Sequence, residues 1–398
     1  MSESHCDQNL PSSDRSLNDE ISVINNLLSV VTLTSSPPSL LPDDWLCAAP
    51  LPTLPLDLIE EIFSRLPVKL LLQLRCVCKR WNSLISDPKF VKKHLSHLTR
   101  RIHFISCLDQ SYNNILTSYP LDSLFTNEVT TSVTQFEYPP NNYEFFDCIV
   151  GSCNGILCLA DYVNSFVLLC NPSLGKFKEL PSLQVLIEVA ISYGFGYDHV
   201  NDNYKVVALL NHTSRIGKTK VKVHALGTNF WKSLDEFPYS GVPVECPGKF
   251  VSGTINWLAC KDEQVIVSFD LENESFQEVP KPDYGNVDEN LVNLGVLRDC
   301  LCVICDQDIW LMKEYRNKES WTKLFTVSNM CDPSNSYALH KAIYIFEDDQ
   351  VLFESRGDWG MKLILYDPKT NTFKFTKFQS ESDYWPHVSV ESLIFPWS

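Results

Sequence analysis

Long apolar runs and basic residues are both scarce in this sequence. No apolar run approaches the ~20 residues that a membrane-spanning helix needs. The apolar stretch at residues 21–33 follows Asp19 and Glu20 rather than a basic segment, so it makes a poor secretory signal peptide. The 398 residues include 33 basic and 49 acidic ones, a net charge of −16, which argues against binding along nucleic-acid phosphates. We therefore expect no nucleic acid or membrane as a partner, and a cytoplasmic or nuclear location.

The motifs of common enzymes are also absent. There is no Gly-x-Ser-x-Gly elbow, phosphate-binding loop or His-Glu-x-x-His helix. The Gly-x-Gly within residues 193–197 lacks the third glycine of a dinucleotide site and indicates a tight strand bend instead. His199, His212 and His224 are separated by 13 and 12 residues, unlike compact metal ligands. These absences predict a protein without cofactor, metal or catalytic activity.

Cysteine is abundant, with 15 residues, but its pattern favours neither disulfides nor a metal site. The number is odd and no export signal is evident, so we expect a reducing compartment. Cys300, Cys302 and Cys305 lie within an apolar run, where thiols pack as small hydrophobic groups. Cys158 and Cys170 have no activating base in their local pattern, so neither is predicted to act as a nucleophile.

Composition divides the chain into three parts. Residues 1–51 carry one basic and seven acidic residues, and we predict a disordered acidic leader over residues 1–44. Residues 52–97 have a positive net charge, with eight basic and four acidic residues. The rest of the chain, from residue 98 on, has a net charge of −14. We predict a small module at residues 45–97 and a large one at residues 100–398, with two different partners.

The small module has the periodicity of helices. Leu58, Ile62 and Leu66 recur every four residues and form an apolar stripe that ends at Pro67. A second helical pattern runs over residues 71–85, and a short amphipathic segment follows. These helices present more apolar surface than a unit of roughly 50 residues can bury alone. Two interpretations stay open, a helical bundle with its own core and a surface that docks on another protein.

Residues 54–81 contain a recognisable motif. The run LPLDLIEEIFSRLPVK from Leu54, the pair Leu71-Leu72 and the run RCVCKRW ending at Trp81 resemble the plant-type F-box. Leu70 and Gln73-Leu74 depart from it, since relatives more often have Ser and Arg-Phe there. The resemblance implies binding to a Skp-type adaptor and through it to a cullin. The residues implied, divided between the docking face and the module's own core, are Leu54, Pro55, Leu58, Ile59, Ile62, Leu66, Pro67, Leu71, Leu74, Val77, Cys78 and Trp81.

The large module repeats a pattern of apolar strand, polar turn and aromatic residue. The aromatics are spaced by 53, 46, 45 and 52 residues, and they are Phe177, Phe230, Phe276, Trp321 and Phe373. Periods of this size, with four strands each, are typical of propeller blades. We predict an all-β propeller of about six blades, in which a weak first unit at residues 102–138 is completed by a terminal strand at residues 388–395. A two-sheet β-sandwich is the alternative.

The repeats lack the marks of two common propeller families. No Gly-Gly doublet and no Trp-Asp pair occurs, so true kelch and WD repeats match poorly. The module instead resembles the plant F-box-associated domain, a kelch-like propeller that receives a substrate. The matching stretches are residues 151–158, 171–173, 193–198, 203–207, 253–258 and 390–393.

Together the resemblances imply the substrate-recognition subunit of an SCF-type (Skp–cullin–F-box) ubiquitin ligase. Such a subunit performs no catalysis and brings a protein substrate to the complex for ubiquitination and proteasomal degradation. A propeller enzyme and a non-degradative scaffold are the alternatives. The net charge of −14 on the large module favours a basic substrate, as for pollen F-box proteins that recognise basic ribonucleases. Acidic surfaces also serve solubility, which is the alternative explanation of this charge. The sequence does not identify the substrate-binding residues.

Overall fold

The structure is a computed structural model, and it describes residues 55–95, 100–108, 113–125, 134–137, 148–161, 165–183, 189–212, 219–238, 247–260, 263–285, 292–327, 338–357, 360–380 and 386–397. The chain divides into two compact units, Met1–Leu54 and Pro55–Ser398. The first unit, and with it the leader predicted for residues 1–44, lies outside the described residues, and the predicted domain boundaries stay predictions. None of the described helices combines the length and the apolar character of a membrane span.

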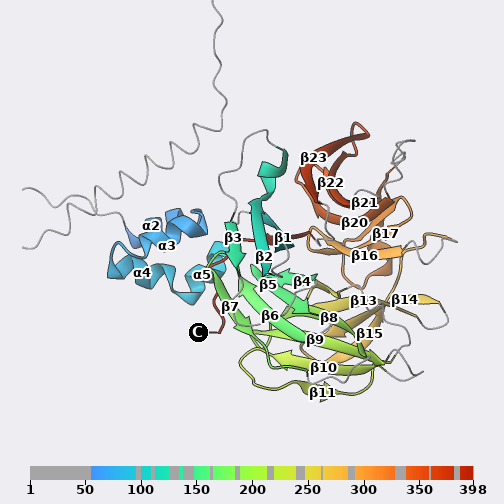
Figure 1. The fold of residues 1–398 in the computed structure, drawn as a ribbon, viewed down its shortest axis with the longest axis horizontal. Helices are drawn as coiled ribbons and strands as arrows, with labels where there is room; N and C mark the ends of the chain where they lie inside the picture. Colours follow the sequence, from blue (N-terminus) through green and yellow to red (C-terminus); the bar gives the residue numbers. More distant parts are fainter. Residues whose placement is uncertain are drawn as a thin grey trace, which may run out of the picture. The chain divides into compact units, whose positions relative to one another are not determined.

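Four short helices come first in the described chain (Figure 1): α2 (Leu56–Phe63), α3 (Val68–Leu74), α4 (Lys79–Ile85) and α5 (Pro88–His94). The pattern predicted as one helical segment over residues 71–85 is divided between α3 and α4, because Cys78 adopts an extended backbone with φ −155°. Asp87 caps α5, where its carboxylate accepts a hydrogen bond from the backbone N–H of Lys89 (2.7 Å). The predicted helical character is confirmed, with one more break than expected.

The helices have an apolar core of their own. Phe63 of α2 and Trp81 of α4 meet edge to face, with ring centroids 5.0 Å apart. The other fully buried aliphatic and aromatic side chains of these helices are Val68, Leu71, Leu74, Ile85 and Phe90. Burying one such side chain contributes about 1.5–3 kcal/mol, so this core holds the short helices together.

Six four-stranded antiparallel sheets follow and form the blades of a propeller. Blade 1 contains β24 (His387–Val390), β1 (Arg100–Leu108), β2 (Asn113–Pro120) and β3 (Thr134–Glu137). Blade 2 contains β4 (Cys148–Cys153), β5 (Ile156–Asp161), β6 (Phe166–Asn171) and β7 (Lys176–Glu179). Blade 3 contains β8 (Val189–Asp198), β9 (Asn203–His212), β10 (Lys220–Ala225) and β11 (Lys232–Leu234).

The remaining blades follow the same order along the chain. Blade 4 contains β12 (Lys249–Val251), β13 (Thr254–Cys260), β14 (Gln264–Asp270) and β15 (Ser275–Val279). Blade 5 contains β16 (Val292–Leu297), β17 (Cys300–Cys305), β18 (Asp308–Met312) and β19 (Trp321–Thr326). Blade 6 contains β20 (Ala338–Ile345), β21 (Val351–Gly357), β22 (Gly360–Asp367) and β23 (Thr372–Ser380). In the described part of the chain, the 3₁₀ helices η3 (Leu121–Phe125) and η5 (Lys318–Ser320) lie between strands.

The innermost strands form a closed ring. In the order β24, β4, β8, β12, β16 and β20, each contacts the next, and β20 contacts β24 again. β24 joins blade 1 by pairing with β1, with His387 opposite His103 and Val390 opposite Arg100. The predicted six-bladed propeller, with closure by a terminal strand, is confirmed, and the β-sandwich is excluded because a sandwich has two facing sheets. The closing strand ends at Val390, before the predicted limit at residue 395.

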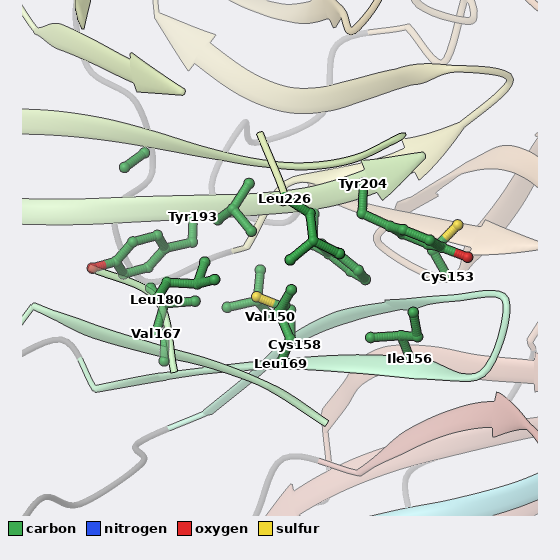
Figure 2. Packing of buried hydrophobic residues seen from close by; sticks show 14 of the residues in the cluster. Val150, Cys153, Ile156, Cys158, Val167, Leu169, Leu180, Tyr193, Tyr204 and Leu226 are labelled. Atoms are coloured by element: carbon green, nitrogen blue, oxygen red, sulfur yellow. The ribbon is translucent and has the colours of Figure 1, made fainter. Parts of the chain in front are cut away.

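Apolar side chains fill the space between neighbouring blades. Figure 2 shows Val150 and Leu169 of blade 2 gathered with Tyr193 of blade 3 in one buried cluster. β5 is buried on both faces, because Cys158 packs in this cluster while Leu157 packs in the cluster shared with blade 1. A strand that is buried on both faces has a continuous apolar sequence rather than an alternation of apolar and polar residues.

The Gly-x-Gly of β8 has a packing role. β8 pairs with β9 without interruption, so the bend predicted at residues 193–197 is wrong. A Cβ atom on Gly194 would overlap Ile255 and would lie 2.8 Å from Trp257 of blade 4. Glycine is needed at this position because blade 4 packs directly on the backbone of β8.

Gly194→Ala is expected to lower the free energy of unfolding by about 1–3 kcal/mol, as overpacking does, because the buried Ile255 and Trp257 would have to shift. Denaturant unfolding followed by tryptophan fluorescence measures the change. Gly295→Ala is the matched control in another inner strand, since its Cβ would meet nothing nearer than 3.9 Å. Equal losses in the two variants would show that blade packing does not require Gly194.

The repeated aromatic residue marks the outermost strand of four blades. It lies in β7, β15, β19 and β23, where the residues are Phe177, Phe276, Trp321 and Phe373. In blade 3 the predicted residue, Phe230, is 63% exposed in the turn before β11, so the prediction for this blade is wrong by one residue. The equivalent of Trp321 is Trp231: the indole N–H of Trp231 donates to the Pro181 carbonyl (2.6 Å), and that of Trp321 donates to the Pro280 carbonyl (2.8 Å).

Candidate functional site

The residues predicted for adaptor binding differ sharply in their exposure. Leu54 lies outside the described residues. The exposed ones are Pro55, Leu58 and Pro67, and the partly buried ones are Ile59, Ile62, Leu66, Val77 and Cys78. Leu71, Leu74 and Trp81 are buried and belong to the core of the helical module. The exposed and partly buried residues remain the candidates for docking.

Helix α2 carries large apolar side chains that its own module does not cover. Leu58 is 51% exposed and Leu56 is 39% exposed. Ile62 lies one turn beyond Leu58 on the same side of the helix. Phe63 already fills the core, and among the described residues this outer side of α2 is left exposed. The sequence prediction misses Leu56, which lies off the four-residue stripe.

The basic charge of the module lies at its surface. Its exposed basic residues include Lys69, Lys79, Arg80 and Lys89. The two glutamates of α2 have partners in the module, because Glu61 pairs with Arg65 (2.6 Å) and Glu60 pairs with Lys93 (3.1 Å). The Arg65 hydrogen bond, followed by that of Lys93, lowers the pKa of Glu61. Such exposed pairs add little stability, but a surface with net positive charge speeds association with an acidic partner.

The propeller cysteines whose side chains the structure describes are packing residues. Cys302 and Cys305 are buried in β17. Burial raises the pKa of the Cys158 and Cys170 thiols far above the ordinary value, so neither forms a thiolate readily. Within the described part of the chain, no group of three or more His, Cys, Asp or Glu residues could hold a metal ion.

The three histidines noted in the sequence differ in their surroundings. His224 is buried in β10, and its Nε2 lies 3.1 Å from the Thr228 carbonyl oxygen. Burial lowers the pKa of His224. His199 is exposed, and its ring packs edge to face on Tyr197. The side chain of His212 lies outside the described residues.

Comparison with known proteins identifies both parts of the chain. Residues 51–93 match the F-box domain, and residues 103–395 match the F-box associated beta propeller domain. The F-box/kelch-repeat protein At3g23880 of Arabidopsis thaliana is 31% identical over 353 residues, which cover 81% of this chain and 90% of that protein. The F-box protein CPR1 of the same plant is 29% identical over 379 residues, which cover 86% of this chain and 89% of that protein. The chain therefore belongs to the F-box proteins with a C-terminal F-box-associated propeller domain.

Family membership confirms both resemblances drawn from the sequence. An F-box domain implies binding to Skp1 within an SCF complex, and F-box proteins are generally non-catalytic adaptors of ubiquitin ligases. The propeller domain follows the F-box domain along the chain.

Proposed function

We propose that this chain is the substrate-recognition subunit of an SCF-type ubiquitin ligase. The outer side of α2, centred on Leu58, binds a Skp-type adaptor that is linked to a cullin, and the propeller binds the protein to be degraded. The observation that carries the proposal is the exposure of Leu56 and Leu58 on a helix whose module already has a filled core around Phe63 and Trp81.

The proposed mechanism is proximity. A substrate held on the propeller is presented to the ubiquitin-charged enzyme of the complex at high effective concentration, and ubiquitin transfer takes place elsewhere in the complex. The raised pKa values of the Cys158 and Cys170 thiols support this division of labour, since a ubiquitin-carrying cysteine must ionise easily.

Reconstitution and partner capture test the proposal. The purified chain is expected to co-elute with a Skp-type adaptor and a cullin in size-exclusion chromatography. In cells, proteins captured by the chain are expected to become more abundant when the proteasome is inhibited. Co-elution without any change in the abundance of captured proteins would favour the non-degradative scaffold instead.

We further propose that the substrate is basic, for example a basic ribonuclease. The support is the charge of −14 on the residues that follow the helical module. Charge complementarity of this kind steers association and is screened by salt. Capture of the substrate is therefore expected to weaken as the salt concentration rises, whereas capture that is insensitive to salt would count against a basic substrate.

A further inference from the structure

The turn that joins β4 to β5 is an Asn-Gly pair. The strand register pairs Cys153 with Ile156, so Asn154 and Gly155 form a two-residue loop outside the ladder. Both residues have positive φ, 52° for Asn154 and 79° for Gly155, as type I′ hairpin turns require. Asparagine and glycine adopt this conformation more readily than other residues do, so the fold itself favours this pair.

The segment that follows β24 covers this turn. A Cβ atom on Gly155 would overlap the Cβ of Ser392 and would lie 2.8 Å from the Val390 carbonyl oxygen. Ser392 is fully buried, and the side-chain amide of Asn171 holds the segment in place by donating to the Ser392 carbonyl. Because the contact is close-packed, the peptide bond between Asn154 and Gly155 has no room to rotate while the ring is closed.

The side chain of Asn154 is held on the neighbouring blade. Its Nδ2 atom donates to the Tyr204 hydroxyl of β9 (3.0 Å). Asn154 is only partly buried and lines an open hollow of about 570 Å³ between inner strands, so water reaches this turn. The turn therefore brings together a carboxamide, a backbone N–H outside the ladder and water.

We infer that Asn154 is a site of deamidation and that closure of the ring protects it. In this reaction the backbone nitrogen of Gly155 bonds to Cγ of Asn154, the Cγ–Nδ2 bond breaks, and ammonia leaves with the proton of the Gly155 N–H. Water then opens the resulting succinimide to aspartate or isoaspartate. Glycine hinders this attack least because it has no Cβ. The ring of the succinimide forms only after the peptide rotates, which requires residues 390–394 to lift off the turn.

The reaction would then prevent the ring from closing again. Isoaspartate adds one atom to the main chain of a two-residue loop, and loop length fixes the register of a hairpin. The longer loop would displace Gly155 against Ser392, and the new carboxylate would replace the donor that faces Tyr204. The inference concerns the propeller alone and does not depend on the proposed ligase function.

Peptide mass spectrometry of the full chain, after incubation at mildly alkaline pH, tests the inference, and enzymatic methylation counts the isoaspartate. Asn154 is expected to convert slowly in the folded chain and fastest in denaturant. In Asn171→Ala the conversion is expected to be about five-fold faster or more, because loss of the anchor favours lifting of the segment. Circular dichroism checks that Asn171→Ala remains folded during the incubation.

The turn before β23 supplies a matched control. Asn371 has the same backbone conformation, with φ 53°, and is exposed, but Thr372 follows it. Asn371 is expected to stay unconverted in the folded chain. In Thr372→Gly it is expected to convert faster than Asn154, at a rate that Asn171→Ala leaves unchanged. The inference is overturned if Asn154 converts as fast in the folded chain as in denaturant, if it does not convert in denaturant, or if Asn171→Ala accelerates both turns equally or neither.

Discussion

Replacing Leu58 and Ile62 with lysine is expected to abolish co-purification of a Skp-type adaptor with the chain. Leu58 is half-exposed and Ile62 lies one turn away on α2, so neither substitution removes a filled part of the core. Burying one such apolar side chain at an interface contributes about 1.5–3 kcal/mol, and a lysine there adds the cost of desolvating its charge. The pair of substitutions should therefore weaken binding by more than about 100-fold.

Calorimetry with purified adaptor measures this effect, and circular dichroism checks that the variant is folded. Phe375→Lys is the matched control, because Phe375 is another large apolar residue that is exposed, but it lies on β23 of the propeller. Adaptor binding that survives the double substitution would refute the assignment of α2. A similar loss with Phe375→Lys would show that the effect is not specific to this helix.

Removal of residues 386–398 is expected to cost more than about 5 kcal/mol of unfolding free energy, beyond the range of most single substitutions. The deletion takes away β24, which pairs with β1 and lies between β20 and β4 in the inner ring. An open edge on β1 and two uncovered blade faces would result. Denaturant unfolding followed by near-ultraviolet circular dichroism measures the loss, and a transition unchanged from that of the full chain would contradict the role of β24.

A single substitution tests how the segment that follows β24 is held on the propeller. The buried side-chain amide of Asn171 donates to the carbonyl oxygens of Ser392 (3.0 Å) and Ile394 (2.8 Å), which fixes the segment after β24 on blade 2. Asn171→Ala should cost about 1–3 kcal/mol, because these acceptors lose their partner. Asn273→Ala, in an exposed turn, is the control and should change stability by less than about 0.5 kcal/mol. Equal effects would mean that the anchor contributes nothing.

The sequence predicts the helices and blades well where local periodicity decides them. The four-residue period of Leu58, Ile62 and Leu66 identifies α2, and the repeated aromatics identify the outer strands. The break at Cys78 has no local signal, because its extended backbone is a feature of the chain path between α3 and α4. The packing role of Gly194 is also hidden in the sequence, since it depends on Trp257 in the next blade.

For the candidate sites too, the sequence predicts what depends on local pattern and misses what depends on tertiary packing. The F-box motif predicts which residues of the helical module matter, but it does not separate Leu58 on the surface from Leu71 in the core, because both occupy apolar helical positions. The hollow lined by inner strands of the propeller has no signature in the sequence, because Lys249, Lys341 and His387 of its wall are far apart along the chain.

The strand that closes the ring also sets a waiting time during synthesis. His103 of β1 and Ser389 of β24 are 286 residues apart in the chain, yet their side chains lie within 2.7 Å. At the usual rate of translation, β1 is synthesised roughly 15–60 s before β24, the strand with which it pairs at the inner edge of blade 1. Blade 1 stays unfinished throughout this interval, and its open edge is accessible to chaperones and proteases. If the proposed function holds, a chain interrupted late in translation would occupy an adaptor molecule without presenting a finished receptor.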